Sequence, residues 1–148
     1  MLKKTLTKQQ SKQREFTMTT IINKINLSDI KEISITAKRW FQKSYGNTYH
    51  SVIVSVVVSR QSANKIDPIS YPLTERNRDV WIDVAYVPFE YGYGNHYCHT
   101  AMRALIEALN DCPEWVNIDN YYHIDRLAKK LGVVYNENVY DVNRKKDL

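Results

Sequence analysis

The sequence predicts an α+β fold, an antiparallel β-sheet with two helices packed on one face. The expected elements run in the order of three strands, two helices and a final strand, and the first two strands are joined by a turn of hairpin length. The chain has 148 residues, of which 43% are hydrophobic and 25% charged, so it has the length of one domain and can bury a core without a metal or disulfide. We expect a disordered basic tail over residues 1–20 and a single α+β domain over residues 21–148.

The strands are recognised by alternation and by β-branched side chains. Residues 32–41 alternate between apolar and polar side chains, as a strand with one buried face does. Gly46 and Asn47 supply a turn before the next apolar run, which makes a hairpin the simplest arrangement. Residues 21–30 are compatible with either a short strand or a helical turn. The expected strands are 32–41, 49–59, 80–89 and 133–142.

Two helices are expected between the third strand and the last one. Apolar side chains recur at helical spacing over residues 96–109 and again over 119–131. Gly132 suits the position that follows a helix C-terminus, where a left-handed backbone is common. Residues 60–79 hold two prolines and seven charged residues, and we expect them to form a long loop.

The second strand has an apolar run that predicts burial on both faces. Residues 52–58 read VIVSVVV, whereas an antiparallel sheet covered on one face should alternate. Two helices can cover only one face of a small sheet. The other face requires either the 60–79 loop or a second subunit, and we expect a homo-oligomer.

The charge distribution argues against a dedicated duplex-binding protein. The net charge is +5, but residues 1–17 contain five Lys and Arg against a single Glu, so the remaining residues are close to neutral. No apolar run approaches the ~20 residues that a membrane-spanning helix needs. With two cysteines, no C-x-x-C motif and no secretory signal, a cytoplasmic location is expected. We therefore expect neither a membrane nor a nucleic acid as the partner.

The sequence Tyr91-Gly92-Tyr93-Gly94 joins the third strand to the first helix. A glycine turn that leads into a helix N-terminus can bind an anion through backbone N–H groups, and the two tyrosine rings can stack on a base. The dinucleotide fingerprint is incomplete, because Tyr97 stands where its third glycine would be. The alternative is a tight turn whose tyrosines pack on the sheet.

Cations and aromatic side chains are combined in Lys38-Arg39-Trp40-Phe41, with Arg39 and Phe41 on one face of the strand and Lys38 and Trp40 on the other. Such a strip can bind phosphates and stack on bases, or it can form a solvated sheet rim. Asn47 is most simply a turn residue. Arg144 and Lys145 belong either to a solvated C-terminal tail or to a segment that folds over an anionic ligand.

No catalytic motif is present, and we expect a protein that is not an enzyme and has no metal or cofactor. His96 and His99 are spaced i, i+3, but two ligands do not make a zinc site. The four histidines form no pair of H-x-[ST] tripeptides, and no G-x-S-x-G motif occurs. His96 remains a binding candidate because it borders the glycine turn. A nucleotide hydrolase with His50 or His96 as its base stays open as an alternative.

Three segments and the C-terminus resemble a family of small phage-encoded proteins. They are AKRWFQK (37–43), YGNTYHSV (45–52), YGYG (91–94) and the ending DVNRKKDL (141–148). The family that this pattern resembles is the first Thoeris anti-defence family, the nucleotide sponges. The resemblance implies an antiparallel sheet with helices in a homo-oligomer that binds cyclic ADP-ribose isomers, or in some members cyclic oligonucleotides, without cleaving them.

The resemblance also implies where the ligand binds. Its positions are Arg39, Asn47, Tyr91, Tyr93, Arg144 and Lys145. The chain departs from the family in its long 60–79 segment and its basic N-terminus. Together with the residue-level candidates, the expected nucleotide-binding residues are Lys38, Arg39, Trp40, Asn47, Tyr91, Gly92, Tyr93, Gly94, His96, Arg144 and Lys145.

The sequence thus predicts a phage protein that sequesters a cyclic nucleotide signal in the host cytoplasm and so blocks Thoeris-type immunity. Two alternatives remain. A small nucleic-acid-binding protein would use the basic tail and the aromatic–cation strip. A nucleotide hydrolase is the weaker of the two.

Overall fold

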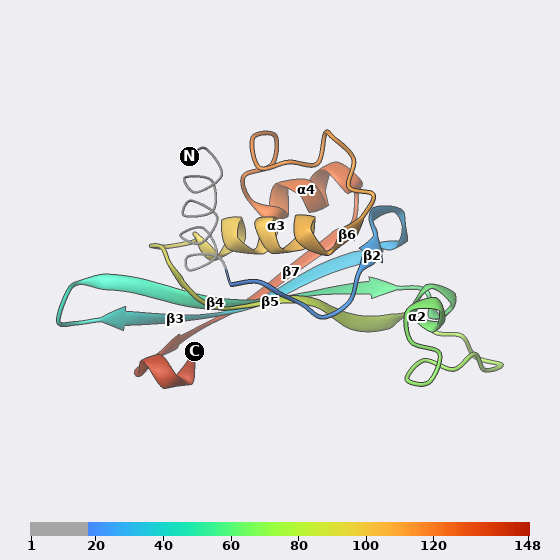
Figure 1. The fold of residues 1–148 in the computed structure, drawn as a ribbon, viewed down its shortest axis with the longest axis horizontal. Helices are drawn as coiled ribbons and strands as arrows, with labels where there is room; N and C mark the ends of the chain where they lie inside the picture. Colours follow the sequence, from blue (N-terminus) through green and yellow to red (C-terminus); the bar gives the residue numbers. More distant parts are fainter. Residues whose placement is uncertain (1–17) are drawn as a thin grey trace, which may run out of the picture.

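A computed structural model describes residues 18–148, and its centre is a five-stranded sheet with helices on one face (Figure 1). The strand order is β1-β5-β4-β3-β7, which confirms the α+β class. A short parallel pair, β2 with β6, lies apart from this sheet. The strands are β1 (Thr20–Ile21), β2 (Ile25–Asn26), β3 (Glu32–Gln42), β4 (Asn47–Val58), β5 (Val80–Tyr91), β6 (Leu109–Asn110) and β7 (Val134–Val142). The helices are η1 (Leu27–Asp29), α2 (Arg60–Ile66), α3 (Tyr97–Ala108), α4 (Ile124–Leu131) and η2 (Lys145–Asp147).

Strands β3 and β4 form the predicted hairpin. They pair antiparallel from Glu32 opposite Val57 to Gln42 opposite Asn47. Gly46 adopts φ 69°, the left-handed conformation that a tight turn requires. The turn was expected to include both Gly46 and Asn47, but it ends at Gly46, because Asn47 is already the first residue of β4.

The sheet is mixed, and the prediction of a wholly antiparallel sheet was wrong. Strand β7 runs parallel to β3, from Glu32 beside Val134 to Trp40 beside Val142. After β5 the chain crosses the sheet through α3 and α4 and enters again on the far side of β3. A crossover through helices brings the next strand in parallel, whereas a short hairpin loop reverses it.

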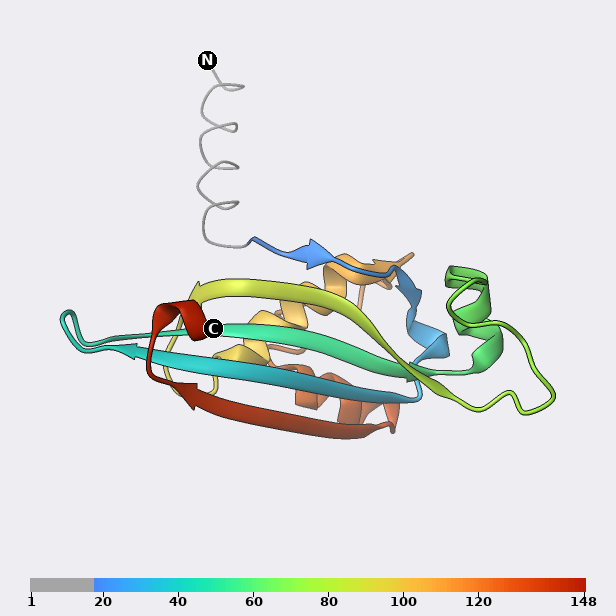
Figure 2. The ribbon, with the colours of Figure 1, turned by 90° about the horizontal axis from the view of Figure 1, so that it is seen from below.

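The segment 60–79 is not wholly a loop, because it begins with α2. Ser59 caps this helix by accepting a hydrogen bond from the Ser62 amide at 3.1 Å, and Ala63 is buried against the core. The molecule therefore has three α-helices within residues 18–148, where two were predicted. Figures 1 and 2 show that this segment extends beyond the end of the sheet instead of covering its open face.

Two predicted helices are present with shorter bounds. Helix α3 covers residues 97–108, and α4 covers 124–131, beginning five residues later than predicted. Gly132 ends α4 with φ 69°, as its position in the sequence predicted. None of the helices over residues 18–148 is long and apolar enough to cross a membrane. The expected basic tail lies outside the described residues up to position 17, and Thr20 already belongs to β1.

The core lies between the sheet and the layer of α3 and α4. Alternate residues of β3 are fully buried there, as the alternation predicted, and they meet Met102 and Leu105 from α3 and Leu127 from α4. In β4, where burial on both faces was predicted, Val52, Val54 and Val56 are fully buried on this side, whereas Ile53 and Ser55 are only partly buried. Burying a side chain of this size contributes about 1.5–3 kcal/mol. The sheet residues concerned are Ile33, Ile35, Ala37, Val52, Val54 and Val56.

Replacing Leu105 with alanine tests this core. Leu105 is fully buried, so Leu105→Ala is expected to reduce the free energy of unfolding by about 3 kcal/mol through lost burial and the cavity left behind. Urea denaturation followed by circular dichroism measures it. Leu73→Ala is the control because Leu73 is 54% exposed, and its effect should stay within about 0.5 kcal/mol. Equal effects of the two variants would contradict the assigned core.

The opposite face of the sheet is open except where the C-terminus returns to it. Figure 2 shows η2 lying on this face, across the sheet from α3 and α4. The Nζ atom of Lys145 lies 4.8 Å from the centre of the Phe89 ring, a cation–π contact that anchors the turn. The side chains that alternate toward this face include Lys38 and Trp40.

Candidate functional site

One end of the sheet gathers most of the predicted binding residues. It is formed by the tip of the β3–β4 hairpin, the end of β5 with the 91–94 turn, and the end of β7. The residues are nevertheless divided between two faces. Because side chains alternate along a strand, Arg39 faces the helix side, whereas Lys38 and Trp40 face the open side.

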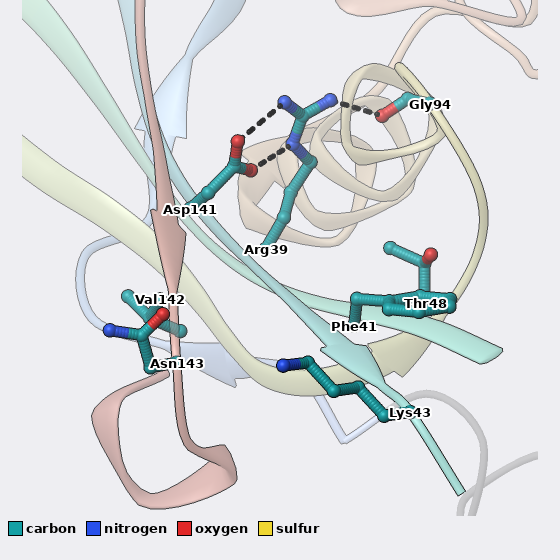
Figure 3. Close-up of a pocket in the computed structure, with 8 residues that line it drawn as sticks. All are labelled: Arg39, Phe41, Lys43, Thr48, Gly94, Asp141, Val142 and Asn143. Carbon is teal, nitrogen blue, oxygen red and sulfur yellow. Dashed lines mark hydrogen bonds and ion pairs between the residues drawn. The ribbon is translucent and has the colours of Figure 1, made fainter. Parts of the chain in front are cut away.

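A hollow of about 570 Å³ lies on the helix side of this end (Figure 3). Of the predicted binding residues, only Arg39 and Gly94 line it. Phe41, which the alternation placed on the face of Arg39, was not among the expected binding residues, and Lys43, just after the end of β3, was missed. The residues that line the hollow are Arg39, Phe41, Lys43, Thr48, Gly94, Asp141, Val142 and Asn143.

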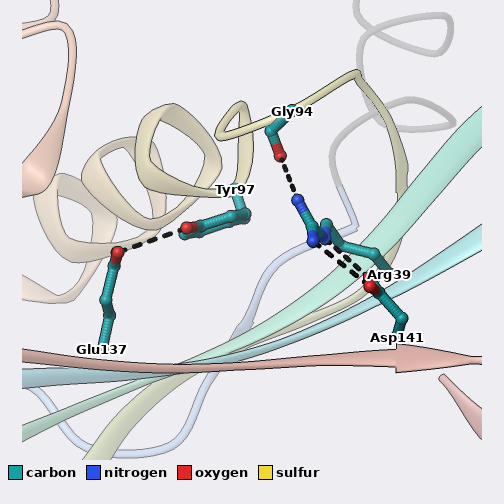
Figure 4. Close-up of polar contacts among 5 residues, drawn as sticks. All are labelled: Arg39, Gly94, Tyr97, Glu137 and Asp141. Atoms are coloured by element: carbon teal, nitrogen blue, oxygen red, sulfur yellow. Dashed lines mark hydrogen bonds and ion pairs between the residues drawn. The ribbon is translucent and has the colours of Figure 1, made fainter.

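The guanidinium of Arg39 is held from two sides (Figures 3 and 4). Its Nε and Nη2 atoms donate to the Asp141 carboxylate at 2.9 and 3.4 Å, which is a bidentate pair. Its Nη1 donates to the Gly94 carbonyl oxygen at 3.3 Å. The Arg39 side chain is 33% exposed and Asp141 is 75% exposed, so the pair borders solvent. With Lys43 also in the lining, the hollow carries a net positive charge.

The turn of residues 91–94 is fixed by close packing and by its glycines. A Cβ atom on Gly92 would lie 2.4 Å from the His96 ring, so no larger residue fits there without movement. Gly94 has φ 57°, and the Tyr91 and Tyr93 rings meet edge to face at 5.4 Å. Both tyrosines are about half exposed. Tyr91 is the last residue of β5, and its ring meets the Tyr49 ring of β4 edge to face at 5.6 Å, so it packs on the sheet.

Some backbone N–H groups of the turn are used within the chain. The amide of Gly92 donates to Thr48, that of His96 to Tyr93, and that of Cys98 to Asn95. These three groups are therefore not open to an anion, whereas the side chains of Arg39 and Lys43 line the hollow with two positive charges.

Asn47 ties the hairpin tip to the same turn. The Tyr93 hydroxyl donates to the Gly46 carbonyl at 3.3 Å and lies 3.4 Å from the Asn47 Oδ1. Asn47 Nδ2 also reaches the Tyr49 hydroxyl at 3.5 Å. Asn47 and Tyr93 thus hold the hairpin tip and the turn together beside the hollow.

A row of stacked rings lies on the open face. Trp40 stacks on Tyr49 with ring centroids 5.7 Å apart, and Tyr49 stacks on Phe89 at 4.6 Å. Lys145 covers the Phe89 ring, as described above. Arg144 forms an ion pair with Asp147 at 3.0 Å within the C-terminal turn. Trp40, Arg144 and Lys145 therefore do not share the hollow with Arg39, and the predicted residues do not converge in one cavity of a single chain.

Three histidines form a cluster behind the turn. His50 is 1% exposed, and its Nε2 lies 2.7 Å from the Thr100 hydroxyl. His96 stands between His50 and His99, with ring centroids 5.8 and 5.1 Å away. His99 donates from Nδ1 to the Tyr122 carbonyl at 2.9 Å. Within residues 18–148, no group of three or more His, Cys, Asp or Glu side chains is placed to hold a metal ion.

Burial keeps these histidines neutral. It lowers the pKa of His50 from 6.5 to about 4, and the neighbouring His96 adds to that effect. Burial also lowers the pKa of His96 and of His99. These rings are suited to neutral packing and hydrogen bonding near pH 7.

A loss of stability in mild acid is the expected consequence. Since the folded state holds His50 neutral and the unfolded chain protonates it at pH 6.5, stability should fall as the pH drops from about 6.5 toward 4. The His50 contribution is about 2 kcal/mol between pH 7 and pH 5, measured as the free energy of unfolding in urea. His50→Gln removes the titrating group, and its stability should vary less over this range. An unchanged pH dependence in this variant would contradict the assignment to His50.

The chain matches no protein-family model, no curated protein and no solved structure.

Proposed function

We propose that the protein binds a small phosphorylated nucleotide in the hollow beside Arg39 and holds it without cleaving it. The observation that carries this proposal is the placement of Arg39. Its guanidinium is oriented by Asp141 and the Gly94 carbonyl and lies beside a second cation, Lys43, in a recess large enough for a nucleotide.

The charges of the hollow suit a phosphate or pyrophosphate group. A guanidinium already fixed in place loses little freedom when it donates to a phosphate, so its charge-assisted hydrogen bonds count more toward affinity. Asp141 opposes an anion by its own charge. Because this carboxylate is 75% exposed, solvent screens part of the repulsion, and its main effect is to hold the plane of Arg39.

A nucleobase has an aromatic surface available in the same recess. Phe41 lines the hollow and is 54% exposed, so part of its ring is free for stacking. Stacking on an aromatic side chain contributes about 1–3 kcal/mol per base. A phosphate beside Arg39 and a base against Phe41 are the two ends that a nucleotide would present.

Sequestration fits the lining better than hydrolysis. The lining contains no histidine and no cysteine, and its one carboxylate is bonded to Arg39. His50 is buried against Thr100, and His96 is packed against Gly92. The sequence resemblance narrows the ligand to cyclic ADP-ribose isomers, with cyclic oligonucleotides as a second class. We therefore propose a homo-oligomeric phage anti-defence protein that depletes the Thoeris signal in the host cytoplasm.

Titration calorimetry with cyclic ADP-ribose isomers tests the proposal, followed by heating and mass spectrometry of the released ligand. Tight binding and recovery of the intact molecule are expected, because a sequestering protein must bind below the concentration of the signal. Absence of binding to any cyclic nucleotide would overturn it. Conversion of the ligand would favour a hydrolase, and salt-sensitive binding of oligonucleotides that is lost with residues 1–17 would favour a nucleic-acid-binding protein.

A further inference from the structure

Strand β7 is a long free edge of the sheet. It pairs with β3 along its whole length, and within residues 18–148 no strand pairs with its outer side. Figure 2 shows this edge uncovered, with α4 lying on the helix side of the strand and not beyond it. The opposite edge carries β1, which has only two residues. An open edge presents unpaired N–H and C=O groups to any strand that can approach it.

The backbone of β7 has no irregularity that would prevent edge pairing, although the strand carries two charged side chains, Glu137 and Asp141. The strand reads VYNENVYDV, without proline, glycine or lysine, and its pairing with β3 contains no bulge. Strand β5, by contrast, contains Pro88 and two register shifts against β4. The β7 edge is therefore regular and able to accept another strand over its nine residues.

We propose that β7 pairs antiparallel with β7 of a second copy about a two-fold axis at Asn138, joining two five-stranded sheets into one of ten strands. This deepens the proposed self-association and does not depend on nucleotide binding. An identical strand can pair with itself about a two-fold axis only in the antiparallel direction. The unpaired N–H and C=O groups of this edge are then hydrogen-bonded in both copies.

Charge selects the register. With the axis at Asn138, Glu137 lies opposite Val139 and Asp141 opposite Tyr135 of the second copy. An axis at Val139 would set Glu137 opposite Asp141, and an axis at Glu137 would oppose two glutamates. Like charges directly opposite each other destabilise a strand pair, so the Asn138 register is favoured.

Helix α4 supplies a complementary charge along the paired edges. Its last turn carries Lys129 and Lys130 and leads through Gly132 into the start of β7. In the Asn138 register the start of β7 lies opposite Asp141 of the second copy, so the two lysines of each chain come to the side of the other chain's Asp141. Opposite charges in this arrangement favour the pairing of a chain with its own copy over an unrelated strand.

The proposed dimer also completes the hollow. Residues 141–143 line the hollow, and in the Asn138 register they lie beside residues 133–135 of the second copy. The last turn of α4 in that copy, with Lys129 and Lys130, therefore comes close to the hollow. A phosphate beside Arg39 would then gain further positive charge from the second subunit.

Cysteine cross-linking tests the register in a Cys112→Ala background. Cys98 stays in place, since it is buried and burial raises its pKa to about 12. Residues opposed across antiparallel strands have Cα atoms about 4.5–5.5 Å apart, which suits a disulfide. Asn138→Cys is expected to give a covalent dimer on mild oxidation. Thr36→Cys is the matched control. Thr36 lies on β3 beside Asn138, so the two Thr36 residues of the dimer would be about 14 Å apart, which is too far for a disulfide.

Sedimentation of lysine variants tests the same interface without oxidation. Asn138→Lys places two like charges at the axis and is expected to give a monomer, whereas Thr36→Lys should leave the dimer intact. Failure of Asn138→Cys to cross-link, together with a monomeric native chain, would overturn the inference. Cross-linking or dissociation caused equally by the Thr36 variants would do so too, because it would indicate pairing through the open face.

Nucleotide titration of the same variants separates this inference from the proposed function. A dimer that cross-links at Asn138 and binds no nucleotide would support the edge pairing and overturn the proposed function. Weaker nucleotide binding by monomeric Asn138→Lys, at least tenfold, is expected if the second copy completes the hollow. Unchanged binding by that monomer would overturn the claim that the second copy contributes to the site.

Discussion

Arg39→Ala is expected to weaken nucleotide binding by a factor on the order of 100. A hydrogen bond to a charged group contributes about 1.5–3 kcal/mol, and the guanidinium can donate more than one to a phosphate. The substitution also leaves Asp141 at the rim of the hollow without its partner, so the net positive charge there is lost. Calorimetric titration with the cyclic nucleotide measures the change in dissociation constant.

Lys38→Ala is the matched control for this variant. Lys38 is the preceding residue of the same strand and carries the same charge, but its side chain faces the open side of the sheet. If the ligand lies in the hollow, Lys38→Ala should change the affinity by less than about threefold. Equal losses in both variants would indicate a nonspecific charge effect, and unchanged binding by Arg39→Ala would remove the basis of the proposed site.

A second substitution identifies the part that Asp141 plays. Asp141→Ala in the Arg39→Ala background removes the unpaired carboxylate, and it should recover part of the lost affinity. Asp141→Ala alone should weaken binding by less than Arg39→Ala does, because it frees the guanidinium instead of removing it. The double-mutant cycle gives the coupling between the two residues, which are bonded directly.

The sequence predicted those features of the fold that depend on local patterns. Alternation placed Ile33, Ile35 and Ala37 on the buried face of β3, and Gly132 marked the end of α4. The direction and neighbour of β7 could not be predicted in this way, because a strand's own pattern does not specify the strand beside which it is placed. Helix α2 was missed because it is short, and the prolines that suggested a loop follow its end.

The candidate site shows a different limit. Lys38, Arg39 and Trp40 were all expected to bind the ligand, although the alternation of the strand had placed Arg39 and Phe41 on one face and Lys38 and Trp40 on the other. Phe41 accordingly lines the hollow with Arg39, and Lys43 joins them from the turn that follows β3. Asp141 could not be paired with Arg39 from the sequence, because their contact depends on the parallel register of β7 with β3.

Arg103→Met is expected to have the largest effect on stability of any single change described here. Arg103 on α3 forms an ion pair with Glu90 on β5, and the two side chains are only 22% and 11% exposed. Methionine keeps much of the aliphatic stem but removes the charge. Glu90 would then remain as a buried carboxylate without a counter-charge, which costs about 3–5 kcal/mol. The free energy of unfolding in urea at pH 7 measures this loss.

The exposed pair of Lys31 and Asp79 provides the control. Their atoms are 3.0 Å apart, but the side chains are about half exposed, so Lys31→Met should change stability by less than about 1 kcal/mol. The difference between the two variants isolates burial as the cause, because both remove one cation from an ion pair. Similar losses in both would contradict the assignment of a buried pair.

Removing both charges of the buried pair should restore most of the stability. In Glu90→Leu with Arg103→Met no charge is left in the interior, and apolar replacements of a buried pair are often neutral or stabilising. The Glu90 Oε2 and Arg103 Nε atoms are buried and have no hydrogen-bond partner among residues 18–148, so the native pair already lacks full compensation. A deficit that persists in the double variant would show that Arg103 acts by packing and not by its charge.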